Sequence, residues 1–464
     1  MPLFIVRHQH DAEHCPAKDP AMGAMLLGHM SRPNVARHGL KIQGEAVVRG
    51  AHTMFFIAEA ADESLVEAFV APFRQAGSVD VMAASTCAGV VASGGCAAPL
   101  PALGDVPALD PETACQDAID AGLVVHRAHP LNGETSVPQL LGGVIMPNAR
   151  FYVRNHFQIP NLDAAGYRLN VGGRVERTLS LSYRELRQMP SQTTLATLEC
   201  AGNGRVWFDP PIPGEQWDIG AVSTAEWTGV PLVDILDRAG IAAGAQEVLF
   251  RGADGGSLED VPTPIRYERS LRIDDARNSG ALLAYLMNGE PLPIHHGFPL
   301  RLIVPSWYAV ASVKWLTEIE LIDRVFTGHY QTDKYWYEFE RDGRDVREPV
   351  NLLQVRSLIT EPGPDAEIEG GDVTIRGVAW SGVAPIARVE VSAGGDWHEA
   401  RLIGEPSRKA WQRWELVTRL DRRGPTTLRA RATDRAGRIQ PEHAEWNRLG
   451  YGNNSVQQIA VQIT

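Results

Sequence analysis

The pattern of hydrophobic and polar positions changes twice along the chain. In residues 1–96, short apolar runs alternate with two segments whose apolar residues recur at helical spacing. The expected strands and helices, in chain order, are strand Leu3–Arg7, helix Pro20–Met30, strands Gly44–Arg49 and Thr53–Glu59, helix Asp62–Gln75 and strand Ser78–Ser85. Asp62 is suited to cap the second helix. The order β-α-β-β-α-β predicts a ferredoxin-like α/β domain.

A proline-rich stretch follows this first region. Residues 97–112 contain four prolines and no periodicity, which is typical of an extended spacer. A short helix over Thr113–Ala121 is expected next, and we place the linker at residues 97–124. From 125 to 345, short β-branched strands alternate with irregular loops and a few short helices, such as the one predicted over Pro231–Ala239. The pattern indicates a mixed α/β domain.

From residue 346 to 464 the pattern becomes that of β-strands. Apolar and polar residues alternate with a period of two in four segments, and Gly-rich or Pro-rich turns separate them. The segments are Val373–Val378, Arg388–Ser392, Trp414–Thr418 and Leu428–Thr433. This alternation predicts an immunoglobulin-like β-sandwich. The expected fold class of the whole chain is therefore α+β.

Composition narrows the classes of partner. A net charge of −12 argues against a nucleic-acid partner or an anionic membrane, and no apolar run is long enough to span a bilayer. Five cysteines are an odd number in 464 residues and do not form a disulfide framework. Residues 1–10 show no signal-peptide core and no twin arginine. We therefore expect a cytoplasmic protein with reduced thiols.

The segment Thr197–Arg205 holds the most distinctive chemistry. An apolar, β-prone approach leads to Cys200, and the small residues Gly202, Asn203 and Gly204 allow a sharp turn just after the sulfur. Arg205 follows five residues on, and a neighbouring guanidinium favours the thiolate, which is the form that binds metals. The alternative is a buried structural cysteine before a turn, because free cysteines mostly lie in cores.

Other motifs occur around this cysteine in a fixed order. In addition to Thr197–Arg205, they are Phe151–His156, Trp217, Gly220–Val230, Leu286–Pro293, His296–Arg301 and Ser312–Leu316. This ordered set resembles the molybdenum-cofactor domain of the sulfite oxidase family, and the resemblance extends over roughly residues 125–464. It implies a molybdopterin-dependent oxidoreductase domain at 125–345 and a dimerisation domain at 346–464, and hence a homodimer.

The resemblance also implies roles for individual residues. Cys200 matches the molybdenum ligand, Arg154 and Arg205 match substrate-binding arginines, Trp217 matches a pocket tryptophan, and Tyr335 matches an active-site tyrosine near the oxo group. The positions that match those holding the pterin and its phosphate are Asn155, His156, Asp254, His296, Arg301, Ser312, Val313 and Lys314. Guanidinium groups are suited to tetrahedral oxyanions, and Arg, Lys and backbone donors are suited to a phosphate.

Three positions depart from the family pattern. Gly204 and Ala311 stand where arginines are usual, and Arg448 lies one residue before the expected arginine. These departures weaken the assignment of sulfite as the preferred substrate, and they leave open whether Arg448 contacts the substrate. They leave the cofactor assignment intact.

Three hypotheses follow from the sequence. The first is the oxidation of sulfite to sulfate by oxygen-atom transfer, a two-electron reaction that needs a cofactor because no side chain performs it. The second is the same scaffold and cofactor acting on sulfane sulfur, nitrate or a sulfoxide. The third is a dimeric binding protein that has kept the fold without activity.

The first region raises two further questions. Histidines and cysteines are frequent in residues 1–96, but none has a recognised zinc spacing, so scattered structural residues are favoured over a metal site. No haem loop, no C-x-x-C-H motif and no cluster-binding cysteine run occurs there. We expect no haem in this chain and a separate, external electron acceptor, whose identity the sequence does not give.

Overall fold

The structure is a computed structural model of the chain. It describes residues 2–10, 18–48, 52–75, 77–84 and 111–464. The chain divides into two compact units, Met1–Leu100 and Pro101–Thr464. In these described stretches, no helix has the length and apolar character needed to cross a membrane.

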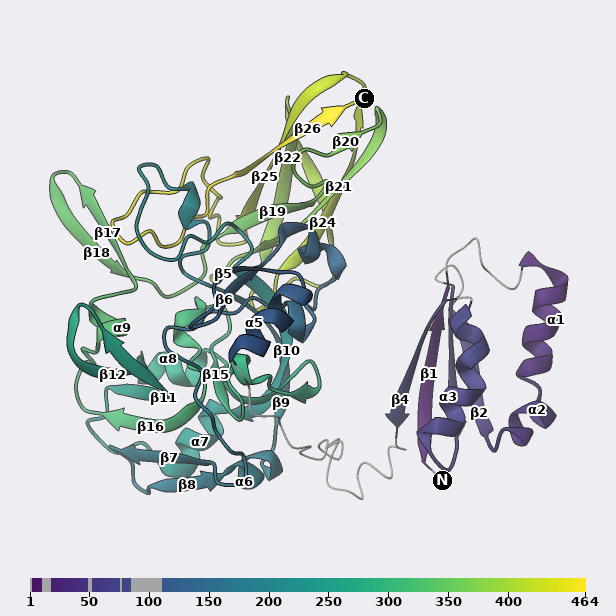
Figure 1. Cartoon of the computed structure of the whole chain (residues 1–464), viewed down its shortest axis with the longest axis horizontal. Coiled ribbons are helices and arrows are strands. Elements are labelled where there is room, and N and C mark those ends of the chain that lie inside the picture. The colour runs from purple at the N-terminus through teal and green to yellow at the C-terminus, as the bar shows by residue number, and fades with distance from the viewer. Residues whose placement is uncertain (1, 11–17, 49–51, 76, 85–110) are drawn as a thin grey trace. The chain divides into compact units, whose positions relative to one another are not determined.

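The first unit is a four-stranded antiparallel sheet with the strand order β2-β3-β1-β4 (Figure 1). Its elements are β1 (Leu3–Gln9), α1 (Pro20–His29), α2 (Arg32–Arg37), β2 (Lys41–Val48), β3 (Thr53–Glu59), α3 (Glu63–Val70), a 3-10 turn (Ala71–Gln75) and β4 (Ser78–Ala84). Asp62 caps α3 by accepting a hydrogen bond from the Leu65 amide at 3.2 Å. The element order is the predicted one, with α2 as an addition.

One predicted helix of this unit is shorter than expected. The segment 62–75 is α-helical only to Val70 and then continues as a 3-10 turn. Pro72 has no amide hydrogen and cannot donate to the preceding turn, which accounts for the change. Val66, Phe69 and Val70 still share the buried face that the sequence indicated.

The predicted linker at 97–124 is wrong in its second half. Residues 97–110 lie outside the described residues, but α5 (Pro111–Asp120) and β5 (Leu123–Arg127) belong to the second unit. Ala114 and Ala118 on α5 are buried in one apolar cluster with Leu123, Leu131 and Val153. The segment is ordered because this small apolar face packs against the loop that leads to the site.

Two sheets, one antiparallel and one mixed, form residues 125–345 of the second unit. The first contains β9 (Gln192–Glu199), β10 (Val222–Pro231), β13 (Leu282–Met287), β14 (Glu290–Pro291) and β15 (Arg301–Ile303). The second contains β7 (Arg168–Gly173), β8 (Leu179–Ser182), β11 (Glu247–Leu258), β12 (Val261–Arg272) and β16 (Leu316–Ile322).

Short helices and hairpins complete this part. They are α6 (Tyr183–Gln188), α7 (Leu232–Ala239), α8 (Ile273–Asn278), α9 (His329–Thr332), the strand β6 (Asn132–Thr135), which pairs with β5, and the hairpin of β17 (Trp336–Arg341) and β18 (Arg344–Pro349). Ser182 begins α6 with a capping box, in which its side chain and that of Glu185 each bond the other's backbone amide. The β17–β18 hairpin crosses the predicted domain boundary at 345/346.

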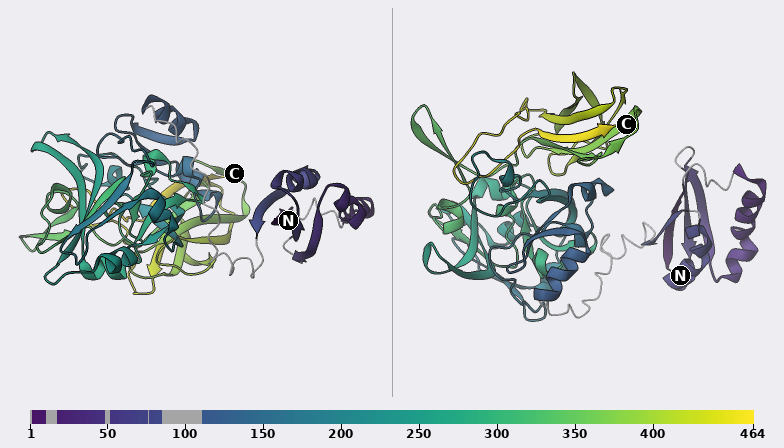
Figure 2. Two further views of the ribbon diagram at one scale, coloured as in Figure 1. Left: turned by 90° about the horizontal axis from the view of Figure 1, so that it is seen from below. Right: turned by 45° about the horizontal axis from the view of Figure 1, so that its top comes forward.

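The C-terminal strands gather at one end of the second unit (Figures 1 and 2). They are β19 (Arg356–Glu361), β20 (Glu367–Ile368), β21 (Gly371–Trp380), β22 (Ile386–Ala393), β23 (Trp397–Ile403), β24 (Gln412–Leu420), β25 (Gly424–Asp434) and β26 (Gln457–Ile463). They form one hydrogen-bonded path, β19-β21-β24-β23-β22-β25-β26-β20, around a buried apolar cluster that includes Ile375, Val389 and Trp414. The predicted sandwich is one curled sheet, because β23 pairs with β22 on one side and with β24 on the other and so joins the two layers.

Candidate active site

A pocket opens in the second unit where strands and loops of both sheets meet. Most of the residues selected from the sequence line it. The lining consists of Phe151, Tyr152, Arg154, Asn155, His156, Leu198, Cys200, Ala201, Asp254, Tyr267, His296, Arg301, Ala309, Val310, Ser312, Lys314 and Tyr335. Chain segments nearly 200 residues apart in sequence therefore converge on one cavity.

Cys200 follows the buried end of β9, where Glu199 pairs with Val222 of β10. The Cys200 amide donates to the Ala221 carbonyl at 2.9 Å, and the Asn203 amide donates back to the Cys200 carbonyl at 2.9 Å. The turn closes at Gly204, whose φ of +82° is accessible to glycine. The strand end and the turn fix the thiol in the pocket wall, as the sequence predicted.

The protonation of this thiol differs from the expectation. Burial raises the pKa of the Cys200 thiol, and the opposing effects of Arg154 and Arg205 are smaller. Both arginines favour the thiolate, as expected, but the net shift of the pKa is upward, because desolvation of the charged sulfur outweighs both guanidinium groups. A metal ion bound at the sulfur would itself deprotonate it.

Arg154 places a guanidinium in the same pocket. Its Nη1 donates to the Asn155 carbonyl and, at 3.4 Å, to Asn132 Oδ1. Both hydrogen bonds that its guanidinium makes to described residues come from Nη1. Arg154 can therefore bind an anion with one edge while the other edge fixes its position.

Tyr335 and His156 form a hydrogen-bonded pair at the pocket wall. The Tyr335 hydroxyl lies 2.6 Å from His156 Nε2. Burial is the main cause that lowers the pKa of His156 and raises the pKa of Tyr335, so both groups are neutral near pH 7. Tyr335 also has a φ of +64°, which is rare for an aromatic residue and is found most often at functional sites.

A second group of polar side chains lies deeper in the pocket. Lys314 Nζ donates to Asn155 Oδ1 and, at 2.9 Å, to the His295 carbonyl. Asp254 is buried, and its Oδ1 has no hydrogen-bond partner in the described part of the chain. Burial raises the pKa of Asp254 and lowers the pKa of Lys314.

The remaining predicted cofactor residues surround Arg301. Its Nη1 donates to the His296 carbonyl at 2.9 Å, Nη2 donates to the Ser312 carbonyl at 3.4 Å, and Nε is buried without a partner among the residues described. Ser312 Oγ accepts from the Val304 amide at 3.0 Å. Val313 is fully buried behind the lining, so it can contribute backbone geometry rather than a pocket surface.

Two predicted catalytic residues are not among the lining residues. Arg205 donates to the carbonyls of Glu215 at 2.9 Å and Leu449 at 3.3 Å, and its guanidinium lies 5.3 Å from the Tyr451 ring. Trp217 is completely buried beside His126. Their roles as substrate-binding residues stay predictions. Arg448, which departs from the family pattern, is exposed and paired with Glu338.

The structure adds aromatic residues that the sequence did not single out. Tyr451 stacks on Tyr335 with ring centroids 4.9 Å apart, and so connects Arg205 to the pocket. Tyr267 and Tyr152 line the cavity directly. Tyr152 stood inside the motif Phe151–His156, which was a usable signal. Tyr267 and Tyr451 had none, because only folding brings β12 and the C-terminal segment to the site.

Two histidines lie close together in the described part of the first unit. His8 Nε2 and His10 Nδ1 lie 3.2 Å apart. No group of three or more His, Cys, Asp or Glu suited to a metal ion occurs in the portion of the chain that is described. His14, Cys15, Cys87 and Cys96 lie outside that portion, so the role of residues 1–96 stays open.

Comparison with known proteins places this geometry in a family. Residues 156–330 match the family described as oxidoreductase molybdopterin binding domain, and residues 347–464 match the Mo-co oxidoreductase dimerisation domain. The chain is 36% identical over 352 residues to sulfite oxidase of Gallus gallus, covering 71% of this chain and 75% of that protein. The chain belongs to the sulfite oxidase family. It is accordingly an enzyme, a molybdopterin-dependent oxidoreductase.

Other members of the family extend this result. Mitochondrial sulfite oxidase of Mus musculus is 34% identical over 389 residues, covering 76% of this chain and 70% of that protein. The crystal structure of the sulfane dehydrogenase SoxCD from Paracoccus pantotrophus is similar with a TM-score of 0.64 and 30% identity, over 72% of this chain and 87% of that chain. The family therefore includes proteins named for different sulfur substrates.

The pocket fits the cofactor of this family. Its wall contains the sulfur of Cys200, a soft donor, and the buried Nε of Arg301 and Oδ1 of Asp254 are a donor and an acceptor without protein partners in the described chain. Unpaired buried polar atoms are costly, so a polar ligand at this place would remove a penalty. Arg301 and Lys314 would hold a phosphate, and Asp254 would accept from an amide-like edge.

Tyr335→Phe tests the hydroxyl at the pocket wall. We expect kcat to fall about two- to tenfold, the value of one lost hydrogen bond, with molybdenum content unchanged. The measurement is steady-state turnover together with elemental analysis of the purified variant. Tyr337→Phe, a buried tyrosine outside the pocket lining, is the control. Loss of molybdenum in Tyr335→Phe would show that the hydroxyl is structural.

Proposed function

We propose that this enzyme oxidises sulfite to sulfate and passes the electrons to an external acceptor. Sulfite and one water give sulfate, two electrons and two protons. The oxygen-atom transfer and the two-electron change are chemistry that the bound molybdenum cofactor supplies. The observation that supports the proposal best is that the Cys200 sulfur and the Arg154 guanidinium line one pocket.

The residues of this chain have separate tasks in that reaction. Cys200 would hold the metal, and Arg154 would bind and orient the substrate dianion through its Nε–Nη2 edge. Tyr335 retains its hydroxyl proton at neutral pH and can donate a hydrogen bond to an oxygen in the pocket. Arg205 would act on the substrate pocket through Tyr451, which stacks on Tyr335.

A second candidate is a sulfane-sulfur dehydrogenase. It is supported by the structural similarity to SoxCD and by the absence of arginine at positions 204 and 311. Nitrate and sulfoxide reduction on the same scaffold remain less favoured alternatives.

The cytoplasmic location and the lack of haem remain predictions from the sequence.

Turnover on a panel of substrates separates these functions. The full chain should contain about one molybdenum per chain, show no haem Soret band, and oxidise sulfite with ferricyanide as the acceptor. We expect kcat/KM to be higher for sulfite than for a sulfane-sulfur compound, nitrate or a sulfoxide. A higher value for any of the others would overturn the sulfite assignment, and a stoichiometric haem signal would overturn the assignment of an external first acceptor.

We also propose that residues 346–464 pair two chains in a C2 homodimer. This domain matches the family's dimerisation domain, and symmetric dimers are the commonest oligomers. Light scattering at micromolar concentration should give about twice the 50.7 kDa of one chain. A monomer would refute the proposal, and a tetramer would indicate a further contact made by the first unit.

A further inference from the structure

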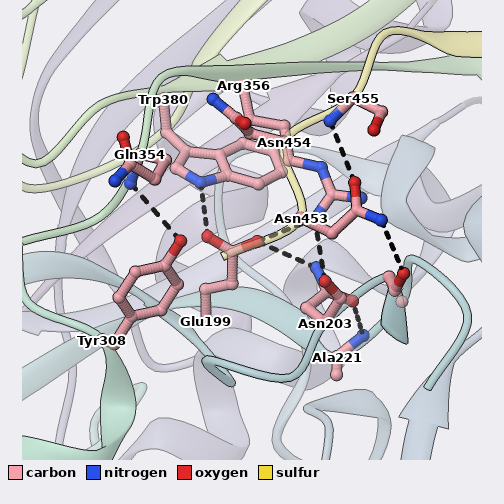
Figure 3. Close-up of polar contacts among 12 residues, drawn as sticks. Glu199, Asn203, Ala221, Tyr308, Gln354, Arg356, Trp380, Asn453, Asn454 and Ser455 are labelled. Carbon is pink, nitrogen blue, oxygen red and sulfur yellow. Dashed lines mark hydrogen bonds and ion pairs between the residues drawn. The ribbon is translucent and has the colours of Figure 1, made fainter. Parts of the chain in front are cut away.

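The turn that carries Cys200 is held by a charge from the C-terminal domain (Figure 3). Arg356, the first residue of β19, places Nη1 3.0 Å from Oε1 of Glu199, and each side chain is only 3% exposed. Trp380 on β21 donates its indole N–H to Glu199 Oε2 at 2.9 Å. The residue directly before Cys200 thus takes two of its hydrogen bonds from the other domain.

The contact between Arg356 and Glu199 also involves Asn203, which follows Cys200 in the turn. Asn203 Nδ2 donates to Glu199 Oε1 at 3.0 Å, and Arg356 Nη1 lies 3.4 Å from the Asn203 carbonyl. Asn203 Oδ1 accepts from the Ala221 amide at 3.1 Å, and the Ala221 carbonyl accepts from Cys200. The hydrogen bonds therefore run from Arg356 to Glu199, from Glu199 to Asn203 and from Asn203 to Ala221. Ala221 in turn bonds the Cys200 amide, so these residues surround the Cys200 backbone.

Backbone carbonyls of the turn are also satisfied from the C-terminal domain. The Ala201 carbonyl accepts from the Gly452 amide at 2.7 Å, and the Gly204 carbonyl accepts from Asn453 Nδ2 at 3.0 Å. A Cβ added at Gly204 would lie 3.1 Å from Arg356 Nη2, so this position has little room for a side chain. The guanidinium occupies the space beside the turn.

Stability alone does not explain a buried ion pair here. Removing two charges from water is costly, and a well-packed apolar pair of similar volume is often as stable. A charged pair whose carboxylate accepts further hydrogen bonds, as Glu199 does from Trp380 and Asn203, is fixed in direction as well as in distance. We propose that Arg356 is a positioning residue for Cys200, so that the domain known for dimerisation also sets the geometry of the metal-binding thiol.

This inference rests on the proposed function only in taking Cys200 as the cofactor ligand. The test uses the full chain produced in a host that cannot make the cofactor. Alkylation of Cys200 by N-ethylmaleimide is followed by peptide mass spectrometry under native conditions, and folding is checked by thermal melting. The variants are Arg356→Gln, Arg356→Lys and the double variant Glu199→Gln/Arg356→Gln. The control is Arg431→Gln, which removes a partly buried pair with Glu390 elsewhere in the same domain.

The proposal predicts alkylation at least about tenfold faster in Arg356→Gln, because a charge-assisted hydrogen bond to the turn is lost. Arg356→Lys should be intermediate, since a lysine keeps the charge but loses the planar guanidinium that places Nη1 between Glu199 and the Asn203 carbonyl. Arg431→Gln should match the wild type. The double variant leaves no buried uncompensated charge, so its alkylation rate tests the proposal if Arg356→Gln alone does not fold. Alkylation of the folded double variant within about twofold of wild type would overturn the proposal.

A second measurement separates this inference from the proposed function. In a host that makes the cofactor, Arg356→Gln should lose molybdenum faster on storage than the wild type or Arg431→Gln. If the wild type itself purifies without molybdenum, the proposed function fails. The alkylation result still stands as the test of whether Arg356 positions Cys200.

Discussion

Cys200→Ser should give a folded protein that has lost nearly all sulfite oxidation. The two side chains are similar in size, and the backbone contacts of the turn do not involve the sulfur. An alcohol oxygen is a poor ligand for a metal that takes a soft thiolate. Because altering groups that only support a metal ligand already costs about 10- to 100-fold, loss of the ligand itself should exceed about 100-fold in kcat.

The control for this variant is Cys115→Ser. Cys115 is a second free cysteine, on α5 and outside the pocket lining, so its replacement should leave turnover unchanged. Thermal melting and molybdenum analysis of both variants show whether folding or cofactor retention has changed. Turnover of Cys200→Ser close to that of the wild type would contradict the ligand assignment.

Arg154→Ala should raise the KM for sulfite about 10- to 150-fold. The expected range follows from a charge-assisted hydrogen bond worth about 1.5–3 kcal/mol. Arg154→Lys should recover only part of the loss, because a single ammonium group cannot form two parallel bonds to an oxyanion. Initial rates over a range of sulfite concentrations give KM and kcat separately for each variant.

Arg150→Ala is the matched control for Arg154. Arg150 lies four residues earlier on the same loop, is exposed and does not line the pocket. Its removal should change KM little, since exposed charges contribute weakly. If Arg154→Ala binds sulfite as the wild type does, the anion site lies elsewhere, and Arg205 becomes the next arginine to test.

Arg205 is a residue whose predicted role and observed position differ. Arg154 and Arg205 both lie within motifs of the family pattern, and the resemblance assigned both to the substrate. In the structure Arg154 lines the pocket, whereas Arg205 donates to two backbone carbonyls and reaches the pocket through Tyr451. Local sequence gives the charge of a side chain, but the direction of the side chain depends on partners far away in the chain.

Much about this protein follows from local sequence. Periodicity predicted the strands and helices of the first unit, Asp62 was predicted to cap its second helix and does so, and the order of motifs predicted the family. These features depend on short-range rules, since capping, turn formation and strand alternation are decided by neighbouring residues. The short helix expected over Thr113–Ala121 is present as α5, but the assignment of this segment to a linker failed, because α5 and β5 pack on a shared apolar cluster with Leu131 and Val153.

Only the tertiary structure decided the surroundings of the thiol. Burial reverses the expected pKa shift of Cys200, because desolvation depends on the whole fold around the sulfur. The pairing of Glu199 with Arg356 joins residues 157 positions apart, and no periodicity or spacing could have indicated it. The sequence named the cysteine as a ligand, whereas the charges, aromatic rings and backbone donors that fix its position come from segments that only folding brings together.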